Sequence, residues 1–289
     1  MENSFLIPSD EQGRKSMDLC ISAFGDTIKK TLIGKSVLGR EINAYTVGEG
    51  GRRVIFFGAH HASESITCNL LFAFIHKFAT GIREGFAREC ALFERFSFLI
   101  VPCLNPDGVE IAMHGCGDSP LSKRIFKMLE DTQRPWQANA RGVDLNHNYD
   151  FGFYKYKQYE REMGIFSGAS LYSGEYPESE PESRAAARLV RASSPIGILS
   201  FHSQGEEIIH TDDERLTRIA SRLERYSGYK DTPPTGSASY GGLSDYTSSL
   251  GIPSFTVEVG KGENPLPITD LPDILGRLYT MTLLFPTFL

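Results

Sequence analysis

Four short apolar runs alternate along the chain with segments of helical periodicity. The runs, at 54–59, 96–102, 196–201 and 254–259, are rich in β-branched and aromatic residues. Each is apolar on both of its alternating faces, as is typical of strands that are covered on two sides. This pattern predicts a parallel or mixed sheet in an α/β fold.

Two segments between these runs have the spacing of an amphipathic helix, with apolar residues sharing one helical face. They are Ile66, Leu70, Leu71, Phe74, Ile75 and Phe78 in the first segment, and Leu216, Ile219, Leu223 and Tyr226 in the second. Gly228 stands where a glycine commonly ends a helix. The interval 116–183 is rich in Gly, Pro, Asn and Tyr and has little periodicity, so we expect long ordered loops there.

The composition fits one large soluble domain. Of the 289 residues, 40% are hydrophobic, which is enough for a substantial core. No run approaches the roughly 18 apolar residues of a membrane span, and the first residues are acidic and polar where a signal peptide is basic and then apolar. We therefore expect a cytoplasmic protein without a membrane partner.

Charge and cysteine content narrow the class further. Thirty basic and 36 acidic residues give a net charge of -6, and no basic stripe is present, which argues against a nucleic-acid partner. The five cysteines are odd in number and never spaced C-x-x-C, which argues against a disulfide framework or a thiolate zinc site. We expect reduced thiols.

Polar residues suited to catalysis follow the predicted strands directly. They are His61 and Glu64 after the first run, Asn105 and Asp107 after the second, His202 after the third, and Glu258 near the end of the fourth. In open α/β sheets, ligands bind at the carboxyl ends of the strands, where residues distant in sequence meet. The chain therefore predicts a site at this edge of the sheet.

Two imidazoles and one carboxylate are the protein ligands of a common catalytic zinc site, whose fourth position holds water. His61 and Glu64 can reach one ion from a single turn, and His202 can reach it from a neighbouring strand. Glu258 is the candidate for removing a proton from that water, whose pKa zinc lowers to roughly 7. His60 competes with His61, because His60 and Glu64 are four residues apart and can share a helical face. A single histidine after a strand is more often a hydrogen-bonded loop residue, so the combination carries this prediction.

Five motifs together resemble the zinc metallocarboxypeptidase superfamily. They are HASE at 61–64, NPDG at 105–108, RGVDLNHNY at 141–149, SFHSQGEE at 200–207 and SFTVEVGKGENPLP at 254–267. NPDG and GVDLN on their own are also ordinary turn sequences. The resemblance begins near residue 15, which leaves 1–14 as an N-terminal extension and 15–289 as the catalytic domain. It implies a single α/β domain with a mixed, twisted, eight-stranded sheet and helices on both faces.

Within this superfamily, the stretches WQANARGVDLNHNYD, YSGEYPESEPES and EVGKGENPLP are most similar to the γ-D-glutamyl-L-diamino acid endopeptidases. Those enzymes cleave the bond between γ-D-glutamate and diaminopimelate or lysine in peptidoglycan stem peptides, so the resemblance implies a peptide substrate. The alternatives are a metallocarboxypeptidase of ordinary C-terminal residues, a related zinc deacylase of N-acyl amino acids, or a catalytically silent module that binds wall fragments. All four proposed zinc and base residues are present, which argues against the last.

The resemblance assigns roles residue by residue. It makes His61, Glu64 and His202 the ligands of one zinc ion, Glu258 the general base and acid, and Asp144 the acceptor of a hydrogen bond from the first histidine ligand. It also places Asn146 and His147 where carboxypeptidases use Asn-Arg to hold the terminal carboxylate of the substrate. Histidine lacks the charged, bidentate fork of arginine, so we expect weaker or different carboxylate recognition.

Two further positions differ from the residues that are usual in the superfamily. Gln137 occupies the slot of the arginine that polarises the scissile carbonyl, with Arg141 or Asn139 as possible substitutes. The mobile tyrosine of the superfamily falls near Ser237, which makes Tyr240 a candidate. In a diaminopimelate substrate, the extra amine could be bound by Glu206 and Glu207, and the extra carboxylate by His147 or Arg141. The alternative interpretation of the two glutamates is a solvated acidic pair on the surface.

Overall fold

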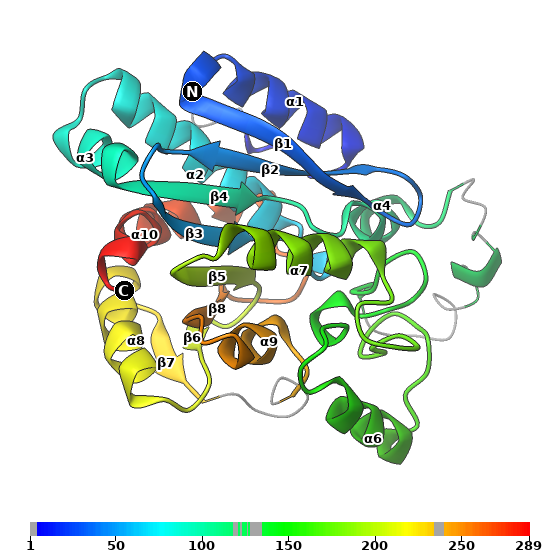
Figure 1. The fold of residues 1–289 in the computed structure, drawn as a ribbon. Helices are drawn as coiled ribbons and strands as arrows, with labels where there is room; N and C mark the ends of the chain where they lie inside the picture. The colour runs from blue at the N-terminus through cyan, green and yellow to red at the C-terminus, as the bar shows by residue number, and fades with distance from the viewer. Residues whose placement is uncertain (1–4, 118–120, 122, 126, 128–134, 234–239) are drawn as a thin grey trace.

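A mixed sheet of eight strands runs through the computed structural model, which describes residues 5–117, 121, 123–125, 127, 135–233 and 240–289 (Figure 1). The strands are β1 (Ile28–Lys35), β2 (Glu41–Val47), β3 (Arg52–Phe57), β4 (Phe96–Val101), β5 (Gly197–His202), β6 (Glu207–Ile209), β7 (Lys230–Thr232) and β8 (Ser254–Glu258). Their order across the sheet is β1-β2-β4-β3-β5-β8-β6-β7.

The four apolar runs form the parallel centre of this sheet. β4 and β5 pair with β3 on its two sides, and β8 pairs with β5, all in parallel. β2, β1 and β6 add antiparallel pairs toward the edges. The carboxyl ends of the central strands therefore meet at one edge, and the expected α/β fold with a mixed eight-stranded sheet is confirmed.

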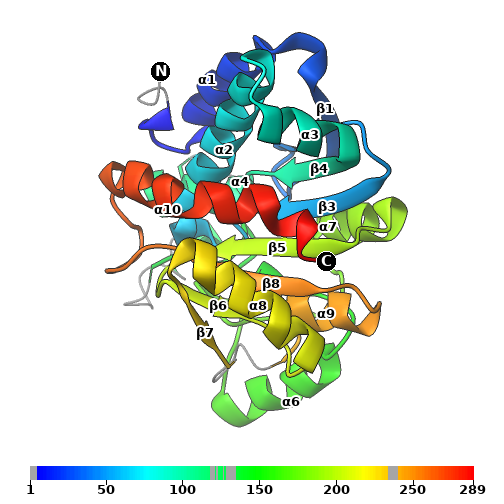
Figure 2. The ribbon, with the colours of Figure 1, turned by 90° about the vertical axis from the view of Figure 1, so that its left-hand side faces the viewer.

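Helices cover both faces of the sheet (Figures 1 and 2). They are α1 (Glu11–Ser22), α2 (Ile66–Arg83), α3 (Ala87–Arg95), α4 (Pro106–His114), α6 (Phe153–Met163), α7 (Pro181–Ser193), α8 (Glu214–Ser227), α9 (Leu243–Ser249) and α10 (Leu271–Leu284).

Residues of β3 alternate between two separate cores. Val54 and Phe56 belong to a core with α2, α8 and α10, whereas Ile55 and Phe57 belong to a core with α7 and α9. Strand side chains point to opposite faces in turn, so a strand covered on both faces needs apolar residues at every position. This requirement explains the unbroken apolar runs in the sequence.

Helix α2 is the most apolar helix of the larger core. With the turn before it, Ala62–Arg83 is long and apolar enough to cross a membrane by length and composition, and 72% of its most apolar window is buried within the protein. Its side chains pack against the sheet through residues such as Leu71, Phe74 and Phe78. We therefore describe it as a core helix.

The N-terminal residues pack against α2. Phe5 is buried in the larger core, and the Ser9 hydroxyl donates a hydrogen bond to the Asn69 side chain. Asp10 caps α1 by accepting a hydrogen bond from the Gly13 amide. The boundary that we expected after residue 14 thus falls inside α1.

The interval expected to contain only loops includes a helix, and for this segment the expectation is wrong. Helix α6 runs between Gly152 and Gly164, both with left-handed backbone at φ 81° and 64°. It buries Phe153, Tyr156 and Glu160, spaced three and four residues apart. Most of its other residues are polar, so its apolar periodicity was too weak to recognise.

Candidate active site

A tight turn after β3 places the first two candidate ligands. Ala59 has a left-handed φ of 47°, which is uncommon for a residue other than glycine. Its amide donates to Thr67 Oγ1 (2.8 Å), and its carbonyl accepts from the Asn105 amide (3.0 Å). The chain then forms a single 3-10 turn, Ala62–Glu64, which leads directly into α2. His61 and Glu64 therefore lie at the carboxyl end of β3.

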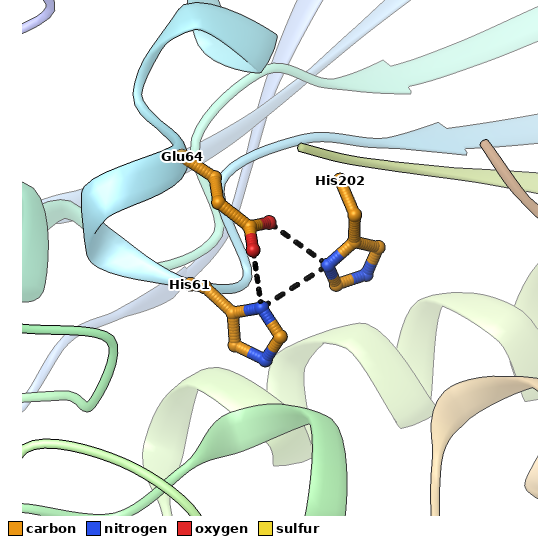
Figure 3. Close-up of side chains that lie close together, drawn as sticks. All are labelled: His61, Glu64 and His202. Carbon is orange, nitrogen blue, oxygen red and sulfur yellow. Dashed lines mark hydrogen bonds and ion pairs between the residues drawn. The ribbon is translucent and has the colours of Figure 1, made fainter. Parts of the chain in front are cut away.

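His61, Glu64 and His202 converge on one point (Figure 3). Glu64 Oε1 lies 2.8 Å from His61 Nδ1, and Glu64 Oε2 lies 2.9 Å from His202 Nδ1. The two Nδ1 atoms are 3.2 Å apart. We call these three residues the metal cluster. It comes from two parts of the chain: residues 61–64 between β3 and α2, and the last residue of β5.

The metal cluster fits one zinc ion. A tetrahedral site with bonds of about 2.0–2.1 Å separates its ligand atoms by roughly 3.4 Å, close to the 3.2 Å between the two Nδ1 atoms. The His61 ring lies between two carboxylates, with Nε2 facing Asp144 (3.2 Å) and Nδ1 facing Glu64 (2.8 Å). A proton held on Nε2 by Asp144 would leave the Nδ1 lone pair for the ion. Two imidazole nitrogens and a carboxylate are also a donor set that zinc prefers.

Asp144 orients the first histidine from behind. Its Oδ1 accepts from His61 Nε2 (3.2 Å) and from the Asn146 amide (3.1 Å), while Oδ2 accepts from the Leu171 amide (3.1 Å). Burial opposes ionisation of Asp144, yet the His61 ring and these hydrogen bonds hold its pKa below the ordinary range. A fixed carboxylate here sets the tautomer and the orientation of His61.

A hydroxyl performs the corresponding task for His202. Ser200 Oγ lies 3.1 Å from His202 Nε2, the nitrogen opposite the metal cluster. Both residues are on β5, two positions apart, so their side chains share one face of the sheet. Sequence reasoning missed Ser200, although this period of two was a usable signal.

His60 is excluded from the metal cluster. Its Nε2 lies 2.9 Å from the Tyr149 hydroxyl, and its Nδ1 lies 3.4 Å from Ser200 Oγ. The ring is fully buried, and burial lowers its pKa well below the ordinary value. The structure therefore resolves the choice that spacing left open, and places His61 beside Glu64 and His202.

Glu258 lies beside the metal cluster in an environment unlike that of Glu64. It ends β8 directly opposite His202 on β5, so the two side chains share one face of the sheet. Burial and the negative charge of Glu64 raise the pKa of Glu258 well above its ordinary value. Burial also opposes ionisation of Glu64, but His61 and His202 lower its pKa to about 2. One carboxyl is thus suited to bind a cation, and the other to hold and release a proton.

The three candidates for carbonyl polarisation lie in different surroundings. The Gln137 backbone is joined to the segment 61–64, which carries two of the metal ligands, because its carbonyl accepts a hydrogen bond from the Ala62 amide (3.0 Å). Asn139 Nδ2 donates to both Glu180 and Glu182, and its Oδ1 accepts two backbone amides, so this side chain is already fully occupied. Arg141 is half exposed and lies 3.4 Å from Glu180. Gln137 and Arg141 remain the candidates on these contacts.

Asn146 presents the donor that we expected, whereas His147 does not. Asn146 Oδ1 accepts from the Leu243 amide (3.3 Å), which leaves its amide hydrogens as donors. His147 Nδ1 lies 3.1 Å from the Tyr240 carbonyl, which can only accept, so the His147 proton is on Nδ1. Burial lowers the pKa of His147, whose neutral ring then offers Nε2 as an acceptor. The expected role as a carboxylate donor does not fit this neutral tautomer.

Tyr240 itself is partly exposed, and Lys155 Nζ lies 3.7 Å from the centre of its ring. This cation–π contact holds the phenol against α6. Within the described part of the chain, no hydrogen bond joins its hydroxyl to the metal cluster. Ser237, the other position considered for the mobile tyrosine, lies outside the described residues.

Glu206 and Glu207 have different surroundings. Glu206 forms ion pairs with Lys261 (2.8 Å) and with Arg277, and these cations lower its pKa despite partial burial. Glu207 lies opposite Glu258 across β6 and β8, so its side chain shares the face that carries Glu258. Of this pair, Glu207 is therefore the better placed to meet a substrate amine, while Glu206 is already neutralised by its own partners.

The NPDG motif supports the site without joining the metal cluster. Asn105 caps α4 by accepting from the Gly108 amide (3.0 Å), and its Nδ2 donates to the carbonyls of His60 (3.1 Å) and Ala138 (3.2 Å). Asp107 accepts from the Leu38 amide (2.7 Å) and pairs with Arg40 (2.8 Å). Asn105 and Asp107 thus connect the loops that surround residues 61–64.

Comparisons with known proteins agree with this geometry. Gamma-D-glutamyl-L-diamino acid endopeptidase 1 of Lysinibacillus sphaericus is 30% identical over 260 residues, which cover 86% of this chain and 64% of that protein. Murein peptide amidase A of Escherichia coli (strain K12) is 23% identical over 166 residues, covering 55% of this chain and 56% of that protein. The chain thus spans less than two thirds of the length of either relative.

The fold is also shared with solved structures. The crystal structure of thrombin activatable fibrinolysis inhibitor superimposes with a TM-score of 0.79 at 19% identity, covering 99% of this chain and 75% of that one. Residues 14–276 match the family described as Zinc carboxypeptidase. By this match and by the metal cluster at the carboxyl edge of its sheet, the chain belongs to the zinc carboxypeptidase family.

Proposed function

We propose that this protein is a zinc-dependent peptidase that hydrolyses the γ-D-glutamyl–diamino acid bond of peptidoglycan stem peptides. The observation that carries the proposal is the convergence of His61, Glu64 and His202 beside a carboxyl group of raised pKa, Glu258. When bound, zinc supplies a polarised water of pKa near 7 and a Lewis acid for the scissile carbonyl. The protein supplies the orientation of the ligands and the proton transfer.

Glu258 performs the proton transfers in this mechanism. It takes a proton from the attacking water and passes it to the nitrogen of the leaving amine as the amide bond breaks. A raised pKa suits this double role, because a carboxyl group near the operating pH can both accept and return a proton. Asp144 keeps His61 in the tautomer that leaves Nδ1 free for the ion. Asn146 offers amide hydrogens toward the bound peptide.

The substrate class is supported by the relatives and by one departure from carboxypeptidases. The two relatives act, by their names, on a γ-D-glutamyl-L-diamino acid bond and on murein peptides. His147 replaces the arginine of carboxypeptidases, and its neutral ring presents an acceptor where that arginine would present a charged donor. This favours a peptidase that does not depend on a C-terminal carboxylate over one that removes ordinary C-terminal residues.

Incubation of the zinc-supplemented protein with L-alanyl-γ-D-glutamyl-meso-diaminopimelate, followed by mass spectrometry, tests the proposal. We expect free diaminopimelate and the dipeptide L-Ala-D-Glu. A hippuryl-type dipeptide serves as the comparison for ordinary carboxypeptidase activity. Efficient cleavage of the hippuryl peptide alone would replace the proposal with that alternative. Full zinc occupancy without turnover of either peptide would instead indicate a silent binding module.

Recognition of the extra amine can be tested with two neighbouring glutamates. Glu207→Gln should raise KM for the diaminopimelate tripeptide several-fold and leave KM for its alanine analogue unchanged, because only the former carries the side-chain ammonium group of diaminopimelate. Glu206→Gln is the matched control, since the Glu206 carboxylate is already paired with Lys261 and Arg277. An equal effect of Glu207→Gln on both peptides would remove Glu207 from substrate recognition.

A further inference from the structure

Two buried cysteines of the larger core directly follow residues that pack against Gly58. Cys68 is in the first turn of α2, and Cys103 is in the connection between β4 and α4; both are free thiols. Each thiol shifts the pKa of the other through a side-chain hydrogen bond. The two thiols are thus placed as a pair.

The backbone shows independently how close the two segments run. A Cβ atom added to Gly58 would lie 3.0 Å from the carbonyl oxygen of Thr67 and 2.7 Å from that of Pro102. These are the residues immediately before the two cysteines. Both carbonyls thus lie close to the same side of Gly58, which only a residue without a side chain allows at this distance.

A cleft connects this pair with solvent. It encloses about 1160 Å³, and its lining includes Cys103, Arg14, Arg40 and Glu110 but no residue of the metal cluster. Cys103 is 7% exposed, whereas Cys68 is fully buried. A small molecule in the cleft can therefore reach Cys103 and not Cys68.

The two thiols differ in chemistry. A hydrogen bond donated by Cys68 and the charge of Arg14 lower the pKa of Cys103, even though burial opposes this. Burial and the same hydrogen bond raise the pKa of Cys68 well above its ordinary value. Arg14 is held in place by the Ser9 carbonyl (2.6 Å) and Glu110 (3.2 Å). The accessible sulfur is thus the better nucleophile.

We propose that Cys68 and Cys103 form a redox-active pair that small-molecule disulfides oxidise through this cleft. The Cys103 thiolate attacks one sulfur of the small disulfide, forms a mixed disulfide and releases the first thiolate. Cys68 then loses its proton, attacks the Cys103 sulfur and releases the second thiolate. The two cysteines lose two electrons in total, and the small disulfide gains them to become two thiols.

The resulting cross-link lies next to the metal cluster. Cys68 is four residues after Glu64, in the first turn of the helix that follows this ligand. Cys103 is two residues before Asn105, whose amide holds the His60 carbonyl. The pair thus joins the two segments that carry and brace the ligands. The redox chemistry itself does not depend on the peptidase activity.

Peptide mapping after exposure to oxidised glutathione tests this inference. The background is Cys20→Ser/Cys90→Ser, in which Cys116, also in the cleft lining, is kept as an internal competitor. We expect a Cys68–Cys103 disulfide in the folded, zinc-supplemented protein, with free Cys116 or Cys116 capped by glutathione. A Cys103–Cys116 link, or a pair that stays reduced while the same protein in denaturant oxidises, would overturn the proposal.

Single variants separate the two steps. In Cys68→Ser, the Cys103–glutathione mixed disulfide should accumulate, because the second attack is lost. In Cys103→Ser, Cys68 should remain a free thiol, because glutathione cannot reach it. Glutathione on Cys68 in that variant would contradict the assigned order. Circular dichroism melting of each variant confirms that it is folded. The single variants Cys68→Ala and Cys103→Ala provide the same two readouts without introducing a buried hydroxyl.

Discussion

The metal side and the substrate side of the site are built differently. His61, Glu64 and His202 of the metal cluster sit at strand ends and a helix-capping turn, and each histidine has a partner behind it. The substrate side, residues 137–147 with Tyr240, is formed by loops that are tied mainly to one another. Short regular elements thus fix the metal geometry, while loop contacts decide which groups face the peptide. The two sides should respond differently to substitution.

The largest effect is expected on the metal side. His61→Ala removes one of the three ligands, so zinc content after gel filtration should fall well below one ion per chain and hydrolysis should drop to background. Atomic absorption and the tripeptide assay measure the two quantities. Arg141→Ala, on the substrate side, is the control and should retain zinc. Full zinc occupancy in His61→Ala would contradict the ligand assignment.

Glu258→Gln should separate chemistry from metal binding. The amide cannot take the proton of the attacking water, so kcat should fall by about 100-fold to 10,000-fold, whereas zinc content should stay at the wild-type level. Single-turnover assays on the tripeptide measure the chemical step. Glu207→Gln, on the same face of the sheet, is the matched control and should change KM more than kcat. Wild-type kcat in Glu258→Gln would remove this residue from the mechanism.

Asp144→Asn should weaken zinc binding by about 10-fold to 100-fold, because a neutral amide supports the His61 tautomer less well. Competition with a chromogenic chelator measures the affinity. Ser200→Ala makes the comparison within the metal side, since it removes the hydroxyl behind His202. We expect a smaller loss of zinc affinity in Ser200→Ala than in Asp144→Asn, because the serine hydroxyl is a neutral partner of its histidine. A larger loss in Ser200→Ala would reverse the assigned importance of the two partners.

The four central strands and the metal cluster were predictable from the sequence for a physical reason, whereas the count of eight strands came from the resemblance. Strands buried on both faces must be apolar throughout, and so runs such as 54–59 were visible as strands without any structure. His61 and His202 then stood directly at strand ends, where a parallel sheet brings residues together. The motifs added Asp144. Spacing did not decide between His60 and His61; the resemblance favoured His61, and the turn at Ala59 supplies the structural reason.

The substrate side was less predictable because hydrogen bonds between loops have no periodic signature. The occupied amide of Asn139, the ion pairs of Glu206 and the tautomer of His147 each depend on residues distant in sequence. Helix α6 was missed for a related reason, since it buries a glutamate whose carboxylate accepts the Ser173 amide. Long-range polar contacts of this kind decide side-chain roles, and a residue's type alone does not reveal them.

His147→Arg gives the smallest effect and the sharpest test of the substrate side. The wild-type ring lies flat against Tyr156, with centroids 3.9 Å apart, and a guanidinium can stack in the same way. The arginine restores a charged donor, so the ratio of kcat/KM for the free tripeptide to that for its C-terminal amide should rise about tenfold, the lower end of the value of a hydrogen bond to a charged group.

This ratio also has a predicted pH dependence in the wild type. Burial lowers the pKa of His147, so its ring is neutral at pH 7 and gains a proton only below its usual range. As the pH falls through that value, the charged ring becomes a donor and the ratio should rise; in His147→Arg it should stay flat. Effects of pH on zinc binding or on Glu258 act on both peptides and cancel in the ratio. A flat ratio in the wild type would mean that His147 does not meet the end of the peptide, and the substrate side would then have to recognise it through Asn146 and Arg141.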